Sequence, residues 1–451
     1  MPGLVQGMEI ARRAMLAHQA ALNITSNNIA NAATVGYTRQ SAILEPTPAE
    51  RTAEGWIGTG VRMAAVRRAR DIFLDTQIRD EMGLQGRWQA RSDLLARIET
   101  VLNEPSDTGL DSLLDEFWNA WLDLSNNPED SAGRAVVVQR GISLAEGLQQ
   151  VDSRIRQVID ATDVDLEARV THLNLLFQET ANLNAQILRA EVNGDVEGNL
   201  RDRRDLILDE LAKEGGAGSL VRADGSVVVR MGGRTVVEGN STVPLATMRY
   251  NDGGRVRVRL IFEQDKTSPS FVSGSLAGLL ETRDQVLPDF LGKMDELAVT
   301  VAEAVNRLHE AGPSHLPFFR GNSAKTIEVV PEIARDASQV NAGTTGDPGD
   351  NDIALAIAAL RDDRILNRGT ATLSDHLRGT IAELGSLAQQ AEFLSGSQDT
   401  AVQSLEAQRQ SVVGVSLDEE LTRMITIQKA YESAARVFSI VSDVFDTLLA
   451  M

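Results

Sequence analysis

The amino-acid sequence predicts a mainly α-helical protein, with long helices and a small β-rich outer module inserted near the middle of the chain. Two stripes of apolar residues at heptad spacing, one at each end of the chain, predict helices that pair as a coiled coil. Between them, helical periodicity extends to about residue 212, and alternating β-branched residues then interrupt it. A chain of 451 residues is long enough for two to four folded units at about 150 residues each.

The first predicted element is a helix over residues 4–32. Its stripe steps by alternating fours and threes, and its members are Leu4, Met8, Ala11, Met15, His18, Leu22, Thr25, Ile29 and Ala32. The loop that follows, SNNIANAATVGYTRQ at 26–40, holds three asparagines, which favour turns, and Gly36, which tolerates a positive φ. From the residues alone, this loop is a turn that ends a helix.

The next stretch, 41–68, is expected to be an extended connector with short strands, because prolines and glycines interrupt any helical pattern. Helical periodicity then returns and continues to about residue 212. Turn-rich stretches predict breaks at 103–109 and at 125–133. The stretch 134–192 is expected to be one long helix with alternating charges on its outer face.

The β-rich module is predicted from two runs of alternating residues. GSLVRADGSVVVRMGGRTVVEG alternates β-branched residues with glycine, and its ADGS tetrapeptide predicts a hairpin. RVRVRLIFE, at 255–263, predicts a further strand. Helix is expected again at about 275–311, followed by an irregular segment rich in Gly, Pro and Asp, and then by helix from about 374 to the end.

The last predicted element mirrors the first. Its helix is expected to open with a capping box, in which the Ser416 hydroxyl accepts from the backbone N–H of Glu419 and the Glu419 side chain returns to the N–H of Ser416. Its heptad stripe consists of Leu417, Leu421, Met424, Gln428, Tyr431, Ala435, Phe438, Ser442, Phe445 and Leu449. Heptads at both extremities predict a hairpin-like chain whose two ends pair and whose middle points away.

These elements divide the chain into five predicted parts. They are an N-terminal helix and loop at 1–40, a helical core in two pieces at 41–212 and 274–413, the β-rich outer module at 213–273, and a C-terminal helix at 414–451. The heptad stripes leave two explanations open. They either pack inside one chain, as in an ordinary helical bundle, or they serve self-assembly and partner docking.

The composition excludes several classes of function. The net charge of −20 argues against nucleic acid as a partner, because phosphate binding needs a basic footprint. The absence of cysteine excludes disulfides, thiolate catalysis and cysteine metal sites. Aromatic residues make up 4% of the chain, which favours helix contacts built on Leu, Ile, Val and Ala over large aromatic cores. The N-terminus does not resemble a cleavable secretory signal, since charged Glu9, Arg12 and Arg13 interrupt it, and no stretch approaches the roughly 18 apolar residues of a membrane span.

Candidate ligand-binding motifs fail by spacing. GNSAKT, at 321–326, lacks two glycines of a phosphate-binding loop, and GTGVRM, at 58–63, lacks the third glycine of a dinucleotide fingerprint. An acidic run that starts at Asp350 resembles the beginning of a calcium loop, but Arg361 occupies the twelfth position, where a carboxylate is needed.

Candidate catalytic motifs fail as well. Asp202, Asp205 and Asp209 share a helical face, but arginines interleave with them, so the sequence favours a solvated, ion-paired face. GVSLD at 414–418 is not a nucleophile elbow, because Asp418 stands where the second glycine belongs. We therefore expect no catalytic residue, no cofactor and no metal, and no enzymatic activity.

Two terminal segments carry a resemblance to known proteins. ALNITSNNIANAATVGYTRQ, at 21–40, contains S-N-N-I-A-N followed by glycine and an aromatic residue, and GVSLDEELTRMITIQKAYESAARVFSIVSDVFDTLLAM occupies 414–451. They resemble the N- and C-terminal signatures of bacterial flagellar axial proteins, the family of rod, hook and hook-associated proteins. Rod and hook proteins generally continue with G-F-K, whereas this chain has Gly-Tyr-Thr, which resembles the hook-associated branch. NLRDRRDLILDELA at 199–212 and GSLAGLLETRD at 274–284 also resemble that branch.

The resemblance implies a structural subunit of the bacterial flagellum at the junction between hook and filament. In this family the terminal helices pair as a coiled coil and line the inner tube of the appendage, and the loop after the first helix contacts neighbouring subunits. The expected partners are further copies of the chain in a homo-oligomeric layer, the hook protein, a second hook-associated junction protein and a flagellar export chaperone, without nucleic acid or membrane insertion. The expected location is extracellular, reached from the cytoplasm by the flagellar type III route without a cleaved signal.

The resemblance also implies which residues form the subunit interface. The expected interface residues are Leu4, Met8, Met15, Leu22, Asn27, Asn28, Ile29, Asn31, Gly36, Tyr37, Leu417, Leu421, Met424, Tyr431, Phe438, Phe445 and Leu449. The alternatives are a flagellar hook or rod subunit and a cytoplasmic coiled-coil scaffold. An enzyme domain in the middle would need a convergent polar constellation, and 213–273 contains no histidine.

Overall fold

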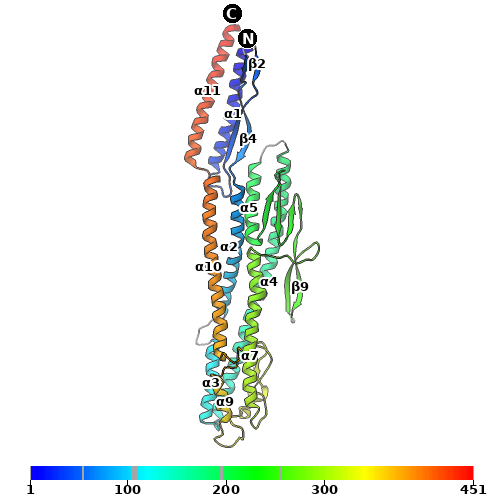
Figure 1. Ribbon diagram of the computed structural model, residues 1–451, viewed down its shortest axis with the longest axis vertical. Helices are drawn as coiled ribbons and strands as arrows, with labels where there is room; N and C mark the ends of the chain where they lie inside the picture. The colour runs from blue at the N-terminus through cyan, green and yellow to red at the C-terminus, as the bar shows by residue number, and fades with distance from the viewer. Residues whose placement is uncertain (1, 53–54, 103–108, 193–196, 253–254, 450–451) are drawn as a thin grey trace.

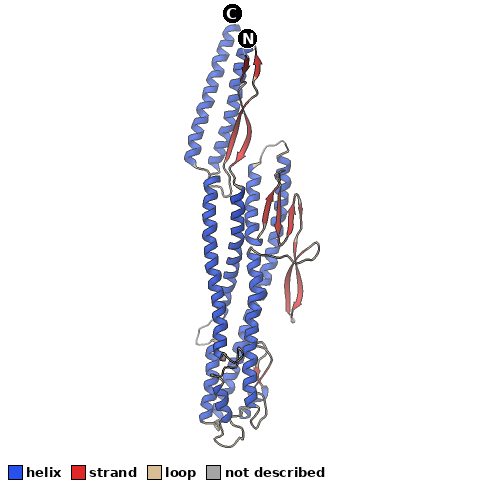
Figure 2. Ribbon diagram, viewed as in Figure 1, coloured by secondary structure: helices blue, strands red, loops and turns tan. Residues whose placement is uncertain are grey.

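The protein is elongated, and its long helices run along the longest axis (Figure 1). The computed structural model describes residues 2–52, 55–102, 109–192, 197–252 and 255–449. Both ends of the chain lie side by side at one end of the molecule (Figure 1). The predicted fold class, mainly α with a small β-rich module, is confirmed (Figure 2).

Long helices set the architecture. They are α1 Pro2–Ala30, α2 Ile72–Leu102, α3 Leu110–Asn126, α4 Ser131–Ala190, α5 Gly198–Gly215, α7 Leu287–His309, α10 Leu373–Val413 and α11 Leu417–Leu449. Shorter helical pieces are α6 Ser275–Glu281, a π-helical turn at Thr282–Val286, α8 Pro331–Arg335, a 3-10 turn at Ala337–Gln339 and α9 Asp352–Ala359. With 60 residues, α4 spans about 90 Å at 1.5 Å per residue.

The predicted helix breaks have a physical basis where the structure describes them. The break at 125–133 is confirmed, because α3 ends there and α4 begins with Asp130 as its cap, whose carboxylate accepts from the backbone N–H groups of Ala132 and Gly133. The break at 103–109 lies outside the described residues except for Gly109. The single long helix predicted at 134–192 corresponds to α4.

The connector after α1 contains short strands, as predicted, and these pair as a long antiparallel hairpin. Its strands are β1 Gln40–Pro46 and β4 Val61–Arg68 at the base, and β2 Glu50–Thr52 and β3 Gly55–Ile57 at the tip. We call residues 40–68 the terminal hairpin. It runs along α1 towards the N-terminus, since Gln40 bonds to Asn28 near the end of α1, and Gly60 lies against Ile10 one third of the way from its start.

The β-rich module is confirmed and lies on one side of the helices (Figure 2). A four-stranded antiparallel sheet has the order β5-β6-β7-β8, and β9 and β10 form a separate hairpin. These strands are β5 Gly218–Val221, β6 Val227–Met231, β7 Arg234–Glu238, β8 Ser241–Thr242, β9 Leu245–Asp252 and β10 Arg255–Phe262. The predicted ADGS turn joins β5 to β6, and the Asp224 carboxylate accepts from the backbone N–H of Ser226. A further short pair is β11 Phe319–Arg320 with β12 Glu328–Val329.

A continuous apolar core runs between α2, α3, α4, α7 and α10. Its backbones approach closely in places: a Cβ on Gly278 of α6 would lie 2.2 Å from the carbonyl oxygen of Arg87 in α2. Most of the core consists of Leu, Ile, Val and Ala, as the composition predicts. The prediction is wrong at the end far from the chain termini, where the aromatic rings of Phe117, Trp121 and Phe318 pack with centroids 5.5–6.3 Å apart. There the irregular segment that contains Phe318 packs on α3. Because this segment is not a helix, its side chains do not interlock with those of α3 as two helices do, and large aromatic rings fill the space between them.

Two short segments join the terminal helices to the rest of the molecule. We call α1 and α11 the terminal pair; they lie side by side, and Val441 of α11 would contact a Cβ placed on Gly7 of α1 at 3.7 Å. The chain leaves α1 through residues 31–39 and enters α11 through 414–416. These two segments meet the ends of α5 and α10, which places the asparagine-rich loop at the base of the terminal pair (Figure 1).

Candidate functional site

The asparagine-rich loop is held by one buried amide. The side chain of Asn28 is fully buried, its Nδ2 donates to the carbonyl of Gln40 at 2.8 Å and to Glu420 Oε2 at 2.9 Å, and its Oδ1 accepts from the N–H of Gln40 at 3.0 Å and the hydroxyl of Tyr37 at 2.8 Å. All four hydrogen-bonding positions of the amide are therefore used. A single side chain thus fixes the end of α1, the loop and the start of α11.

Glu420 is the matching buried group on α11. Its side chain is fully buried, and Oε1 accepts from Arg39 Nε at 2.8 Å while Oε2 accepts from Asn28. Arg39 also reaches Glu419 at 3.3 Å, and its backbone N–H donates to the carbonyl of Val413 at 2.9 Å. A buried carboxylate needs such compensation, because its desolvation is costly when it is unpaired.

Tyr37 and Gly36 shape the loop. Burial, together with the negative charges of Asp202 and Glu420, raises the pKa of Tyr37 to about 12, so its hydroxyl keeps the proton that it donates to Asn28. Gly36 has φ +78°, and a Cβ there would lie 2.6 Å from the side chain of Leu206 in α5. Both facts demand glycine, because any side chain would be strained and would collide with α5.

The loop is tied to the helical core through Asp202. The N–H of Thr38 donates to Asp202 Oδ2 at 3.1 Å, and Arg68 of the terminal hairpin pairs with the same carboxylate. Arg68 also pairs with Asp205 at 3.1 Å. The segment NLRDRRDLILDELA, noted in the sequence, therefore supplies the carboxylates that receive the loop.

Below this contact lies a closed cycle of ion pairs, which we call the ion-pair ring. Its members alternate in charge and are Asp75, Arg70, Asp205, Arg79, Asp209 and Arg409. The closest nitrogen–oxygen distances between successive members are 2.5, 3.0, 3.3, 2.8, 2.8 and 4.0 Å. The ring links the start of α2 with α5 and α10.

The predicted solvated face of α5 is wrong on two counts. Asp202 and Asp209 are buried, and the partners of the α5 carboxylates come from β4, α2 and α10 and not from the interleaved arginines. Arg201 instead pairs with Glu191, and Arg204 is buried and donates to the carbonyl of Gly225 at 2.8 Å. The physical reason is that three helices converge on this face, so it is interior.

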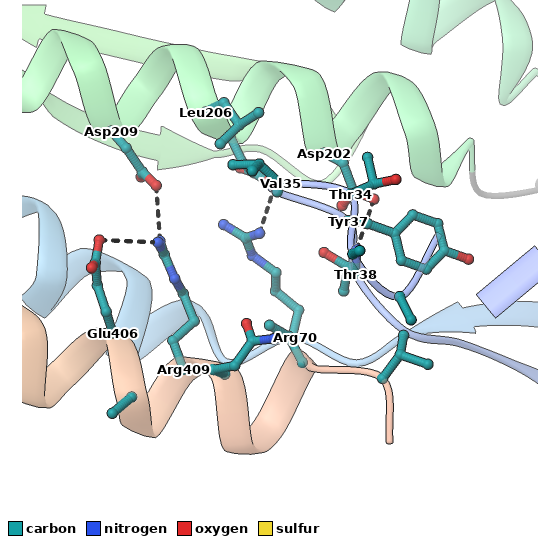
Figure 3. A pocket seen from close by; sticks show the side chains of 18 of the residues that line it. Thr34, Val35, Tyr37, Thr38, Arg70, Asp202, Leu206, Asp209, Glu406 and Arg409 are labelled. Atoms are coloured by element: carbon teal, nitrogen blue, oxygen red, sulfur yellow. Dashed lines mark hydrogen bonds and ion pairs between the residues drawn. The ribbon is translucent and has the colours of Figure 1, made fainter. Parts of the chain in front are cut away.

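The ring borders a pocket of about 700 Å³ between the loop, α5 and α10. Figure 3 shows Arg409 lying between Asp209 and Glu406, and Arg70 pointing in from the start of α2. Burial disfavours the charged form of Asp205, but the guanidinium groups around it outweigh burial and lower its pKa. Each of the six groups of the ring has two partners of opposite charge. We call this ring, together with the contacts of Asn28, Glu420 and Asp202 above it, the joint.

The described residues contain no group of three or more His, Asp or Glu side chains placed to hold a metal ion. Among the described helices, none carries an apolar stretch long enough to cross a lipid bilayer.

The predicted interface residues on the α1 side fall into two groups. Leu4, Met8, Met15, Leu22 and Ile29 are half-buried on α1. Asn28 and Tyr37 meet in the buried network, whereas Asn27 is exposed and Asn31 bonds back to it at 2.9 Å. Gly36 is exposed at the loop tip.

On α11 the less exposed residues coincide with the predicted stripe in part. They are Glu420, Met424, Ile427, Ala430, Tyr431, Ala434, Ala435, Phe438, Val441, Ser442 and Phe445. Met424, Tyr431, Ala435, Phe438, Ser442 and Phe445 belong to both sets. The remaining predicted residues Leu417, Leu421 and Leu449 are exposed.

The predicted capping box at the start of α11 is replaced by other contacts. The Glu419 carboxylate pairs with Arg39, and the Ser416 backbone carbonyl accepts from Glu420. A capping box does occur at the start of α10, between Thr372 and Asp375. Long-range pairing thus overrides the local motif at Ser416.

Sequence reasoning missed Glu420, Arg39 and Asp202 as joint residues. A signal for Glu420 existed: the register that contains Ile427, Ala434 and Val441 places this carboxylate in the apolar seam, where a charge needs a buried partner. No local pattern identifies Asp202 as the acceptor for Thr38, which is 164 positions away along the chain.

Comparison with known proteins agrees with this architecture. The family model described as "Flagellar hook-associated protein FlgK helical domain" matches residues 95–316. The model described as "Flagella basal body rod protein" matches 8–38, and "Flagellar basal body rod FlgEFG protein C-terminal" matches 402–451. A paired-terminus helical protein with these segments is a flagellar axial protein.

Relatives named flagellar hook-associated protein 1 align along the whole chain. The protein from Bacillus subtilis strain 168 is 33% identical over 100% of this chain and 98% of its own length. Those from Salmonella typhimurium and Escherichia coli K12 are 25% and 24% identical, each over 96% of this chain and 97% of their own length. The chain therefore belongs to the flagellar hook-associated protein 1 family and has a structural role at the flagellar hook–filament junction.

The fold is similar to that of a solved relative. The flagellar hook junction protein FlgK from Burkholderia pseudomallei superposes with a TM-score of 0.65 at 15% identity, and the match covers 75% of this chain and all of that one.

Proposed function

We propose that the protein forms a layer of identical copies at the distal end of the hook, and that the terminal pair is its assembly element. In this arrangement the pairs of successive copies line a central tube, while the helical core and the β-rich module lie further out. Family models for rod proteins match at both termini, which supports a shared mode of assembly with other axial proteins. A heterologous contact between neighbours is what a tubular layer needs.

The observation that carries this proposal is the exposed apolar surface of α11. Leu421 and Ile425 lie on one flank of the helix, next to its N-terminal end, and are 48% and 55% exposed. Val437, Ile440 and Val444 lie on the other flank, nearer the C-terminus. We call these the first flank and the second flank. Covering a half-exposed aliphatic side chain is worth about 1 kcal/mol, so the five together favour association by several kcal/mol.

The layer would mediate between two neighbours of different structure. We propose the hook protein as the partner on one side and a second hook-associated junction protein on the other, with an export chaperone bound before secretion. The proposed export route is the flagellar type III pathway, without removal of an N-terminal signal. The protein acts by polymerisation and shape and, in this proposal, has no catalytic step.

Incorporation into the appendage tests the proposal. The chain, expressed in a strain that lacks its own copy, should appear by immunoblot in appendages sheared from washed cells and by immunolabelling at the hook–filament boundary. Labelling along the whole hook, or absence from the sheared material, would contradict a junction role.

A matched pair of variants tests the assembly element. Ile425→Ser removes an exposed apolar residue of the first flank and should reduce incorporation with little change in monomer stability. Leu175→Ser removes a residue that is 65% exposed on α4, outside the terminal pair, and should incorporate as the unsubstituted chain does. Equal incorporation of both variants would show that α11 does not form the interface.

A further inference from the structure

The tip of the terminal hairpin presents an aromatic side chain that the described residues leave largely uncovered. Trp56 of β3 is 72% exposed, and its neighbour Ile57 is exposed as well. The described residues at the tip, 48–51 and 55–58, are all exposed. An isolated two-stranded hairpin is marginally stable in water, and exposed tryptophan is typical of binding hot spots.

The hairpin is anchored just below this tip. Thr59 is buried, its hydroxyl donates to the carbonyl of Pro48 at 2.7 Å, and its own carbonyl accepts from Arg13 of α1 at 3.3 Å. The backbone of Gly60 lies against Ile10. The tip is therefore held in place beside the first turns of α1 and is not a free loop.

The second flank of α11 lies close to the level at which the hairpin is anchored to α1. Val441 of α11 would contact a Cβ on Gly7, which is less than one turn from Ile10, the residue that Gly60 of the hairpin lies against. Val437, Ile440 and Val444 surround Val441 in the helix, and Ile440 is 62% exposed. In Figure 1, α11 lies to the left of α1 and β2 lies to its right. Each copy thus carries two uncovered apolar features at the same end of the terminal pair, on different sides of α1.

The charges of the two sides are complementary. Residues 1–70, which hold α1 and the terminal hairpin, contain eight arginines and four glutamates; Arg39, Arg68 and Arg70 already pair with carboxylates of other elements, which leaves a net charge of +1. The helix α11 contains six carboxylates and three basic side chains; Glu419 and Glu420 already pair with Arg39, which leaves a net charge of −1. Contact between like sides of two copies is disfavoured by repulsion, and contact between unlike sides is favoured.

We propose that, in the assembled layer, Trp56 of one copy docks against the second flank of α11 in the next copy. This inference rests on the proposed function and specifies one of its contacts. The occupant is a second copy of the chain because a repeating contact of this kind covers every Trp56 and every second flank in the interior of the layer. The contact is heterologous, so it propagates around the tube and does not end at a dimer.

Cysteine cross-linking in assembled appendages tests the contact, because the chain has no cysteine of its own. Gly58→Cys keeps Trp56, and a Cβ at Gly58 meets nothing within 4 Å. It is combined with Ser433→Cys, one heptad before Ile440 on the second flank. The control combination uses Ser439→Cys, which is exposed and directly precedes Ile440 in the helix but lies on the opposite flank. A disulfide needs Cα atoms within about 7 Å, so a short thiol-reactive cross-linker is used in parallel with oxidation.

A ladder of dimers and higher multimers with Ser433→Cys, much stronger than with Ser439→Cys, is the expected result. A link within one chain, equal ladders for both combinations, or no link in appendages that contain the chain would overturn the proposal. Absence of the cysteine-free protein from appendages would instead refute the proposed function.

Substitution of the tryptophan gives a second readout. Trp56→Ala should leave the melting temperature of the free monomer unchanged and lower incorporation at least about tenfold, the effect expected of a binding hot spot. Trp56→Phe should retain most of the incorporation. Normal incorporation of Trp56→Ala would exclude Trp56 as an anchor, whatever the cross-linking shows.

Discussion

Replacing Asn28 by alanine should release the terminal pair from the rest of the molecule. The substitution removes three hydrogen bonds with neutral partners, two with the backbone of Gln40 and one with Tyr37, and one with the Glu420 carboxylate. A neutral bond contributes about 1 kcal/mol and a bond to a charged group about 1.5–3 kcal/mol. Tyr37 is half-buried and can turn to water, so its bond is left out of the sum, and we expect the remaining three bonds to cost about 3.5–5 kcal/mol in the stability of the joint.

Hydrogen exchange resolved along the chain is the appropriate assay, because the terminal pair can open without global unfolding. Amides of α1 and α11 should lose protection in Asn28→Ala by a factor of roughly 100 or more, while those of α4 and α7 remain unchanged. Asn27→Ala is the matched control, since its exposed side chain makes a long contact of 3.4 Å with Tyr37 and accepts a local hydrogen bond from Asn31 at 2.9 Å, and it should change protection little. If the opening free energy of the α11 amides in Asn28→Ala stays within about 1 kcal/mol of the value in the unsubstituted chain, Asn28 is not the residue that holds the joint together.

Four further predictions concern assembly, order, acid and metals. Replacing Leu421 and Phe438 together with serine should block incorporation, while circular dichroism should show that the helical core stays folded. The Phe438 substitution alone should lower the stability of the terminal pair in the free monomer, and the Leu421 substitution alone should not. Filaments of normal length from the double variant would count against α11 as the assembly interface. The helices α1 and α11 should exchange faster than α4 and α7 in the free monomer and more slowly in appendages, because ordering costs about 1–2 kcal/mol per residue and the pair lacks cover on its outer flanks; equal exchange of the pair in both states would exclude further ordering on assembly. The lowered pKa of Asp205 means that its charge stabilises the fold above its ordinary pKa, so the melting-temperature difference between the unsubstituted chain and Asp205→Asn should shrink as the pH falls below about 4; a constant difference down to pH 2.5 would contradict this. Chelator should leave the melting temperature unchanged, and elemental analysis should find no stoichiometric metal; a stoichiometric metal would overturn this expectation.

The sequence was sufficient to predict the order and type of the elements, because periodicity is a local property. The heptad stripes, the break that Asp130 caps and the ADGS turn were all visible within a few residues. The register of α11 could not be predicted in this way. Apolar character favoured Leu421 over its charged neighbour Glu420 as the residue that contacts α1. The seam accepts Glu420 only because Arg39 and Asn28 compensate it, and both arrive from the other end of the chain.

The same limit applies to the α5 carboxylates. Their neighbours in sequence are arginines, which suggested ion pairs within α5 on a solvent-exposed face. Their partners in space are Arg79, 130 positions from Asp209, and Arg409, 200 positions from it. A spacing rule cannot report which helices converge, so burial and long-range charge pairing were inaccessible to it.

The closed form of the ion-pair ring has a mechanical consequence. Each of its six groups touches two others, so stretching one contact leaves every charge with a remaining counter-ion. A rotating appendage applies cyclic torque to the contacts between its parts. In a linear series of ion pairs, the loss of one pair would separate the helices on either side of it. A ring shares the load and can re-form a ruptured pair while its other contacts keep the helices in register. In the proposed layer, the joint would therefore yield slightly under torque and recover its geometry when the torque reverses.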